Sequence, residues 1–186
     1  MFSILKKIFN TPRTVIKTDI LFFTEDKELN TTALELDAKV KKLFRGSLAI
    51  REVAAGSSNA EEQELTALTN PYYDAERFGI HFVASPRHAD MLMVSGPVSR
   101  NMQEGLRRTY EAMPTPKLVV AVGDGAINGS VFRGSYAVLD SVRDVIPVDF
   151  EIPGDPPSPK DVLVALNQML SLHEKKNVKG TPTSAN

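Results

Sequence analysis

The 186-residue sequence contains no cysteine. This absence excludes disulfides, thiolate nucleophiles, cysteine-ligated zinc and iron–sulfur clusters bound in the ordinary way. Long hydrophobic runs are missing too: strictly apolar runs such as Leu118–Val122 are far shorter than the roughly 20 residues of a bilayer-spanning helix. Charge of one sign is not in excess, because the net charge is −1 at pH 7, so binding to nucleic acid is not expected.

The residues that are present predict one globular domain built from layers of helices and strands. The length suffices for one domain with a sizeable core. Apolar runs without alternation indicate strands that are buried on both faces of a parallel sheet. These runs are Leu48–Val53, Ile80–Ala84, Met91–Ser95, Leu118–Val122 and Val145–Val148. Helical patterns alternate with them at Thr32–Arg45, Ala60–Leu68, Arg100–Met113 and Asp161–Leu172, which indicates an α/β fold.

The beginning and end of the chain differ from this pattern. Residues 1–18 contain basic but no acidic side chains, and Phe2, Leu5 and Phe9 have helical spacing. This segment is expected to form a short amphipathic helix that either contacts a membrane or membrane-embedded partner, or covers the domain. Four segments are therefore predicted: the amphipathic segment 1–18, an N-terminal extension with a helix at 19–46, the α/β domain at 47–174 and a disordered tail at 175–186.

Three loops that follow predicted strands are the candidate site, because ligands of open α/β sheets bind at the carboxyl ends of the strands. The loops are Gly56–Glu61, Gly123–Gly129 and the proline-rich Ile152–Pro159. The two glycines of Gly123–Gly125 are typical of a phosphate-binding turn, but the third glycine of a dinucleotide fingerprint is missing and no helix is expected to follow.

The acidic side chains of these loops allow two interpretations. Glu61, Asp124 and Asp155 could converge as oxygen ligands of a divalent cation. The favoured interpretation is that they cap helices or face solvent. The three histidines fall on different predicted elements, and no ligand set is expected from them. No pair of nucleophile and base and no pair of catalytic carboxylates is indicated.

Several long motifs carry a family resemblance. They are 47–59 (SLAIREVAAGSSN), 67–82 (ALTNPYYDAERFGIHF), 85–90 (SPRHAD), 95–102 (SGPVSRNM) and 153–159 (PGDPPSP). Together they resemble the small subunit of energy-converting membrane-bound [NiFe] hydrogenases. That family is homologous to the small, cluster-bearing 20 kDa-type subunit beside the quinone site of NADH:quinone oxidoreductase. The resemblance covers roughly residues 45 to 172 and implies a flavodoxin-like, three-layer domain with a mostly parallel sheet.

The sequence departs from this family at the cofactor. The family's loops read Gly-Ser-Cys-Asn-Gly-Cys, Gly-Asp-Cys and Pro-Gly-Cys-Pro-Pro, and their four cysteines hold one proximal [4Fe–4S] cluster. The matching positions here are Ser58, Glu61, Gly125 and Asp155. Glycine has no side chain, and the other three offer hard oxygen atoms that suit a soft iron–sulfur cluster poorly. The resemblance therefore implies a member without the cluster, and no cofactor or metal is expected.

The resemblance also implies a function in a larger assembly. It predicts a non-catalytic, peripheral subunit of a membrane-bound hydrogenase-like or NADH:quinone-oxidoreductase-like complex on the cytoplasmic side of the cell membrane. The subunit would be a structural and coupling bridge between a hydrogenase-like large subunit and a membrane-embedded subunit of an ion-translocating module, with a ferredoxin-like subunit as a further partner. The expected partner contacts are Arg87, His88, Asp90, Val98, Ser99, Arg100, Asn101 and Met102, and the membrane-side contacts are Phe2, Leu5 and Phe9.

Two alternatives stay open at this stage. The chain could still be a redox subunit that uses another cofactor or another electron path. It could also be a small-molecule or metal-binding module that reuses the vacated loops, with Glu61, Asp124 and Asp155 as the ligands.

Overall fold

The computed structural model describes residues 27–179, with side chains through Lys175. The amphipathic helix predicted around Phe2, Leu5 and Phe9 lies outside the described residues. At the other end, the last helix, α6, spans Pro159–Lys179 and therefore continues past the predicted domain boundary at 174. Its continuation has a simple cause, since no glycine or proline interrupts the sequence after Pro159 until Gly180.

A parallel sheet of five strands forms the centre of the molecule, in the order β2-β1-β3-β5-β7. This is the strand order of flavodoxin-like folds. The strands are β1 (Leu48–Ala54), β2 (Ile80–Phe82), β3 (Met91–Ser95), β5 (Leu118–Val122) and β7 (Phe150–Ile152). Every residue of β3 and β5 is buried, as expected for the inner strands of a covered parallel sheet. A separate antiparallel ribbon pairs β4 (Val98–Ser99) with β6 (Val138–Leu139).

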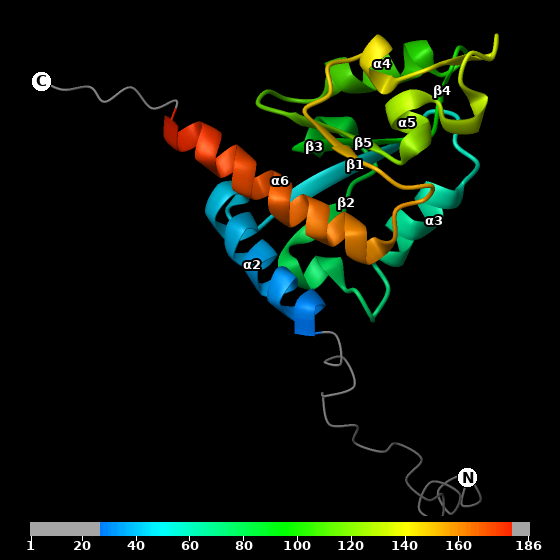
Figure 1. Cartoon of the computed structure of the whole chain (residues 1–186). Coiled ribbons are helices and arrows are strands. Elements are labelled where there is room, and N and C mark those ends of the chain that lie inside the picture. The colour runs from blue at the N-terminus through cyan, green and yellow to red at the C-terminus, as the bar shows by residue number, and fades with distance from the viewer. Residues whose placement is uncertain (1–26, 180–186) are drawn as a thin grey trace, which may run out of the picture.

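Helices cover both faces of this sheet and complete the predicted three-layer α/β fold (Figure 1). One face carries α2 (Lys27–Phe44), α3 (Ala60–Ala67) and α6, and the other carries α4 (Gln103–Ala112) and α5 (Asp124–Asn128). Short 3₁₀ helices lie in the connections, at η2 (Ala75–Phe78), η3 (Pro86–His88), η4 (Ser130–Phe132) and η5 (Val142–Asp144). None of the described helices is long and apolar enough to cross a membrane.

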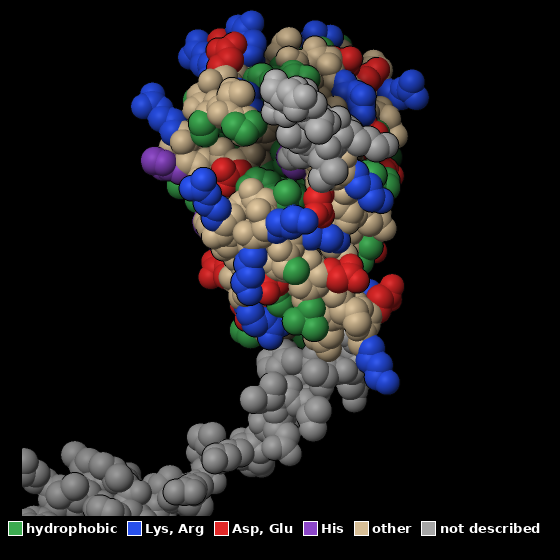
Figure 2. Space-filling view, turned by 90° about the vertical axis from the view of Figure 1, so that its left-hand side faces the viewer, with side chains coloured by type: hydrophobic (Ala, Val, Ile, Leu, Met, Phe, Trp, Pro, Cys, Tyr) green, Lys and Arg blue, Asp and Glu red, His purple; other side chains and the backbone are tan. Residues whose placement is uncertain are grey.

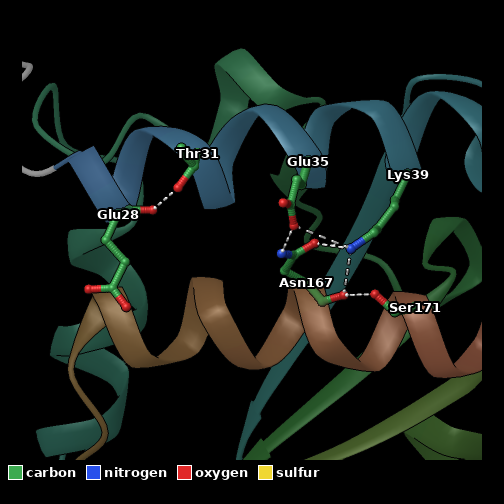
Figure 3. Close-up of polar contacts among 6 residues, drawn as sticks. All are labelled: Glu28, Thr31, Glu35, Lys39, Asn167 and Ser171. Atoms are coloured by element: carbon green, nitrogen blue, oxygen red, sulfur yellow. Dashed lines mark hydrogen bonds and ion pairs between the residues drawn. The ribbon is translucent and has the colours of Figure 1, made fainter.

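Helix α2, which belongs to the predicted N-terminal extension, packs beside α6 and contributes Leu36 and Val40 to the core. Figure 3 shows the polar contacts between the two helices. The Lys39 ammonium donates to the backbone carbonyl of Asn167 at 3.2 Å and to its side-chain oxygen. The Asn167 amide in turn donates to Glu35 at 2.9 Å. These contacts join an element near the start of the chain to its last helix.

The surface carries both charge signs in close proximity. Figure 2 shows the side of the molecule at which α6 ends, where Lys and Arg side chains lie among Asp and Glu side chains. Ion pairs such as Lys42 with Glu174 and Lys41 with Asp37 contribute to this pattern. The arrangement agrees with the net charge of −1.

Two expectations from the sequence are wrong. The apolar run Val145–Val148 is not a strand; the fifth strand is β7, which pairs with Val120–Val122 of β5. Pro147 has no N–H to donate within the run, and Ile146 is instead buried in the core on the α4 side. A helix does follow Gly123, because α5 begins at Asp124. Its five residues are too few to show a helical period in the sequence.

Candidate functional site

The loops after β5 and β7 are joined by backbone hydrogen bonds at the carboxyl edge of the sheet. The N–H of Gly123 donates to the carbonyl of Ile152 at 2.8 Å, and the N–H of Asp124 donates to the carbonyl of Gly154 at 2.8 Å. The Asp124 carboxylate accepts from the N–H of Gly154 at 3.0 Å. These bonds hold the two loops as one unit.

The loop after β1 meets the turn after β3 at the same edge. The Gly96 and Gly56 positions lie so close to neighbouring backbone that neither can carry a side chain. A Cβ on Gly96 would lie 2.3 Å from the Cα of Ser57, and one on Gly56 would lie 2.6 Å from the carbonyl oxygen of Pro97. Both residues also have positive φ, which favours glycine. The chain needs glycine here because two loops cross in contact.

The Gly125 position brings the loop after β5 into this contact as well. A Cβ on Gly125 would lie 2.9 Å from Cδ of Pro97 and 3.3 Å from Cα of Gly96. The three candidate loops and the Gly96–Pro97 turn therefore pack together at one end of the sheet. The absence of a side chain at position 125 allows this close approach.

The four positions that match the family's cysteines differ in burial. Glu61 and Gly125 are buried, whereas Ser58 and Asp155 are exposed. Asp155 accepts a hydrogen bond from the hydroxyl of Ser130 at 2.9 Å, which ties the loop after β7 to η4. The loops meet, but the side chains at these positions do not form one set of ligands that point at a common centre.

Glu61 is the most unusual of these residues. The residue is only 4% exposed, and one carboxylate oxygen, Oε2, has no hydrogen-bond partner among the described residues. It packs against Gly123, where a Cβ would lie 2.8 Å from the Oε1 of Glu61 and 2.9 Å from its Cγ. Burial raises the pKa of the Glu61 carboxyl, and the negative charges of Glu62 and Asp155 raise it further. The glutamate thus lies in the interior of the loop cluster.

The residues at this edge do not fit a [4Fe–4S] cluster. Cluster ligation needs thiolates, and the chain has none. Gly125 lies against Pro97, so a ligand side chain at position 125 would have no room. In the described part of the chain, no group of three His, Asp or Glu residues is arranged to hold a metal ion.

A second polar group lies beside the loops and was not predicted from the sequence. Glu62 on α3 accepts hydrogen bonds from the hydroxyls of Ser57 and Ser95, and Ser95 also lies 3.5 Å from the Glu52 carboxylate. Glu52 and Glu62 line a cavity of about 370 Å³, together with Arg51, Leu65, Thr66, Thr69, Phe82, Val83 and Ala84. The available signal was the pair Arg51–Glu52 inside the otherwise apolar strand β1.

The predicted contact segment Val98–Met102 supports an exposed hydrophobic loop. Its first two residues pair with β6, and the backbone and side chain of Arg100 donate to the carbonyls of Ala137 and Tyr136 at 3.0 and 2.6 Å. The supported loop exposes large apolar side chains to solvent: Val131 is 83% exposed, Phe132 50% and Tyr136 90%. This loop, 130–137, is a second feature that sequence reasoning missed. Asn101 is exposed and Met102 is half-buried.

The other predicted contact residues lie at the opposite end of the sheet. Arg87 and His88 are exposed on η3, before β3 begins. Asp90 accepts from the N–H of Ala49 at 3.0 Å and so fixes the pairing of β1 with β3. Strand β3 separates these residues from Val98–Met102, so the predicted contacts form two surfaces rather than one.

Comparisons with known proteins found a matching family model and several relatives. Residues 59–169 match the model of the NADH ubiquinone oxidoreductase 20 kDa subunit family. The chain is 42% identical over 126 residues to the probable membrane-bound hydrogenase subunit mbhJ of Pyrococcus furiosus, covering 68% of this chain and 75% of that protein. It is 37% identical over 141 residues to formate hydrogenlyase subunit 7 of Escherichia coli, covering 76% and 55%.

A solved structure shares the fold. One chain of the membrane-bound sulfane sulfur reductase, an archaeal respiratory membrane complex, superposes with a TM-score of 0.63 at 31% identity. The match covers 77% of this chain and 76% of that one.

Proposed function

The chain belongs to the family of the NADH ubiquinone oxidoreductase 20 kDa subunit, and we propose that it is a cluster-free peripheral subunit of a membrane-bound, hydrogenase-like respiratory complex. In this proposal it bridges a large subunit and the membrane arm on the cytoplasmic side, and its own role is structural and coupling rather than catalytic. The relatives that support the assembly are subunits of a membrane-bound hydrogenase and of formate hydrogenlyase.

The observation that carries the proposal is the combination of retained loops and lost ligands. The loops still meet at the carboxyl edge of the sheet, whereas Ser58, Glu61, Gly125 and Asp155 replace all four family cysteines. At these positions the loops pack tightly, because Gly125 lies against Pro97 and Glu61 is turned into the interior. A fold that is kept while every cluster ligand is replaced is expected where assembly, rather than electron transfer, is the retained role.

The large subunit is proposed to dock on the loop 130–137. Exposed aromatic and aliphatic side chains near a rigid support are typical anchors of protein interfaces. Phe132 and Tyr136 lie on a loop that Arg100 and the β4–β6 ribbon hold in place, and Ser130 bonds it to Asp155 of the vacated site. The docking surface is therefore continuous with the loops that bear the cluster in the family.

The membrane arm and the ferredoxin-like subunit are proposed to contact other surfaces. Arg87 and His88, at the amino end of β3, are available on a surface separate from the loop 130–137. The basic, amphipathic segment 1–18 is proposed to contact a membrane-embedded subunit of the ion-translocating module. The division into segments 1–18, 19–46, 47–174 and 175–186 stays a prediction.

A co-purification experiment tests the docking surface. The full chain carrying Phe132→Ser and Tyr136→Ser is tagged and purified from its own cells, and the retained partners are identified by mass spectrometry. Loss of two aromatic anchors is expected to reduce retention of the large subunit by about tenfold or more. The matched control is Leu34→Ser on α2, which removes another large, exposed hydrophobic side chain, since Leu34 is 68% exposed.

Two outcomes of this experiment would contradict docking of the large subunit at the loop 130–137. Retention of the large subunit at the wild-type level by the double variant, with an unchanged melting temperature, contradicts docking at the loop 130–137. Equal loss in the Leu34→Ser control indicates a general effect of the substitutions on folding or solubility, and the docking assignment then fails as well.

A further inference from the structure

A groove lies between helix α2 and the short helix η2, and the proposed function gives it no occupant. Its volume is about 480 Å³. Five of its lining residues, from Asn30 to Lys41, belong to α2 and have the spacing of one helix face. Arg77 and Phe78 of η2 form the other wall. This α2–η2 groove therefore runs along the length of α2.

Apolar side chains line the α2–η2 groove. Ala33 and Phe78 are buried, at 4% and 7% exposed, whereas Leu34 beside them is 68% exposed. Together they form a contiguous apolar surface rather than a single exposed leucine. An apolar surface of this kind, with polar residues at its rim, is typical of a contact with another segment or protein.

The charged residues of the groove are mainly basic. Lys41 and Arg77 are cations, and Asp37 is the one acid among the residues that line the groove. Lys41 pairs with Asp37 at 2.7 Å, while the Arg77 guanidinium lies 4.7 Å from the centre of the Phe78 ring and 3.7 Å from Asp74. Both basic side chains are more than half exposed, so each has room to pair with a further acid.

The sequence directly before α2 is complementary to this groove. Residues 19–26 read DILFFTED, so that the apolar run Ile20–Phe23 has acidic residues on both sides and no basic residue among them. An apolar run fits the apolar wall, and its acidic neighbours have the charge that Lys41 and Arg77 attract.

The length of this segment also agrees with the length of the groove. A reversal of the chain takes about four residues, which Thr24–Lys27 provide. The residues before the reversal, Asp19–Phe23, span about 17 Å when extended. Along α2, the rise from Asn30 to Lys41 is also about 17 Å.

We propose that the α2–η2 groove binds residues 19–23 of the same chain, which run antiparallel to α2. The apolar side chains of Ile20–Phe23 cover Leu34 and Phe78, and Asp19 lies near Lys41. The groove thus anchors the sequence that connects residues 1–18 to the domain.

This anchoring directs residues 1–18 toward one end of the molecule. Helix α2 ends at Phe44, just before β1 begins at Leu48, so its end lies at the amino end of the sheet. Arg87 and His88 are exposed at that same end. The segment and these two residues are then placed to contact one membrane-side partner. Only this consequence rests on the proposed function, because docking in the groove needs no partner.

Tryptophan fluorescence of the isolated full-length chain tests the proposal, because the chain contains no tryptophan. Phe22→Trp and Phe23→Trp are made separately, since neighbouring side chains of an extended chain face opposite sides. At least one reporter is expected to emit at a shorter wavelength than in urea and to be protected from quenching by acrylamide. Leu34→Asp, which places a charge in the groove, is expected to remove both effects. The matched control is Leu172→Asp on α6, a residue that is 50% exposed outside the groove and leaves the reporter unchanged.

An exchange of charges tests the direction of the segment. Lys41→Glu is expected to reduce the protection of the reporter, and the addition of Asp19→Lys is expected to restore it, because these two residues face each other in the proposed course. Circular dichroism verifies that each variant is folded. The exchange locates the segment even if Leu34→Asp fails to fold.

Three results overturn the docking. Both reporters emit as they do in urea, or Leu34→Asp leaves the protection unchanged, or the protection falls on dilution, which indicates that a second copy of the chain covers the groove. Failure of Asp19→Lys to restore the protection overturns the antiparallel course. Because these measurements use the chain without partners, they are independent of whether a large subunit docks at the loop 130–137.

Discussion

Substitution of Gly125 by alanine measures how tightly the loops pack at a position that matches one of the family's cluster ligands. The added methyl group would lie 2.9 Å from Cδ and 3.2 Å from N of Pro97, and 3.3 Å from Cα of Gly96. These atoms belong to a proline ring and to backbone, so they cannot rotate away as a flexible side chain would. Gly125 lies within α5 and has no positive φ, so the substitution introduces packing strain without backbone strain.

Gly105→Ala on α4 is the matched control that isolates the packing cost. A Cβ there would meet only the end of the Met102 side chain, at 3.7 and 4.0 Å, which is ordinary contact. Both substitutions reduce the conformational freedom of the unfolded chain, which stabilises a protein by about 0.4–1 kcal/mol. This shared effect cancels in the difference between the variants. Overpacking costs about 1–3 kcal/mol, so Gly125→Ala is expected to be less stable than Gly105→Ala by that amount.

Urea denaturation of the full chain, followed by circular dichroism, gives the two free energies of unfolding. A thermal scan provides a second estimate, in which 1 kcal/mol corresponds to roughly 2–4 °C for a protein of this size. Gly105→Ala is expected to melt at or above the wild-type temperature and Gly125→Ala below Gly105→Ala. Equal stability of the two variants would refute the reasoning, because room for a methyl group at position 125 means that the loops are not in tight contact there.

Three further predictions concern stability and attachment. Burial raises the folded-state pKa of Glu52 and Glu61 above the ordinary glutamate value of about 4.3, so both groups stabilise the fold below that pH, and this contribution is lost as pH rises through the folded pKa. Glu52→Gln should therefore flatten the decline of the unfolding free energy in urea from about pH 4.3 upward, and an unchanged slope argues against it. Asp124→Ala leaves the N–H of Gly154 without its acceptor and should cost about 1–3 kcal/mol, and a neutral effect in the same assay shows that water replaces the bond. Deletion of residues 1–18 should release the protein from isolated membranes without lowering its melting temperature, and a clear drop indicates packing on the domain instead.

Much of the fold follows from local patterns, because the inner strands are buried on both faces. Met91–Ser95 and Leu118–Val122 are predicted as strands, and the structure has strands with the same bounds. The fifth strand escapes prediction because Phe150–Ile152 contains the polar Glu151 and is defined by its pairing with β5. Short elements such as α5 carry too few residues for a periodic signal.

The sequence predicts which loops form the candidate site, because those loops follow the ends of the predicted strands, but it does not predict the contacts of the side chains there. The rule that loops meet at the carboxyl edge of a parallel sheet places Glu61, Gly125 and Asp155 in neighbouring loops. The Glu52–Ser95–Glu62 group depends on where α3 packs over the sheet, which no local pattern in the sequence specifies.

The predicted partner contacts also show what the sequence leaves unspecified, because residues that are close in sequence do not share a surface. Asp90 and Arg100 belong to adjacent motifs in the sequence, but strand β3 carries them to opposite ends of the sheet. Asp90 serves the pairing of strands, and Arg100 serves the exposed loop 130–137. Proximity in a motif therefore did not indicate a shared surface.

Iron and acid-labile sulfide in the full-length chain provide the most direct test of the cluster-free account. The chain is produced together with its partners, separated from them, treated with iron and sulfide under reducing, oxygen-free conditions and desalted. The account predicts well under one iron per chain and no electron paramagnetic resonance signal of a cluster after reduction, because no thiolate is present. About four irons per chain, with matching sulfide and a cluster-type signal, would contradict the account and restore an electron-transfer role.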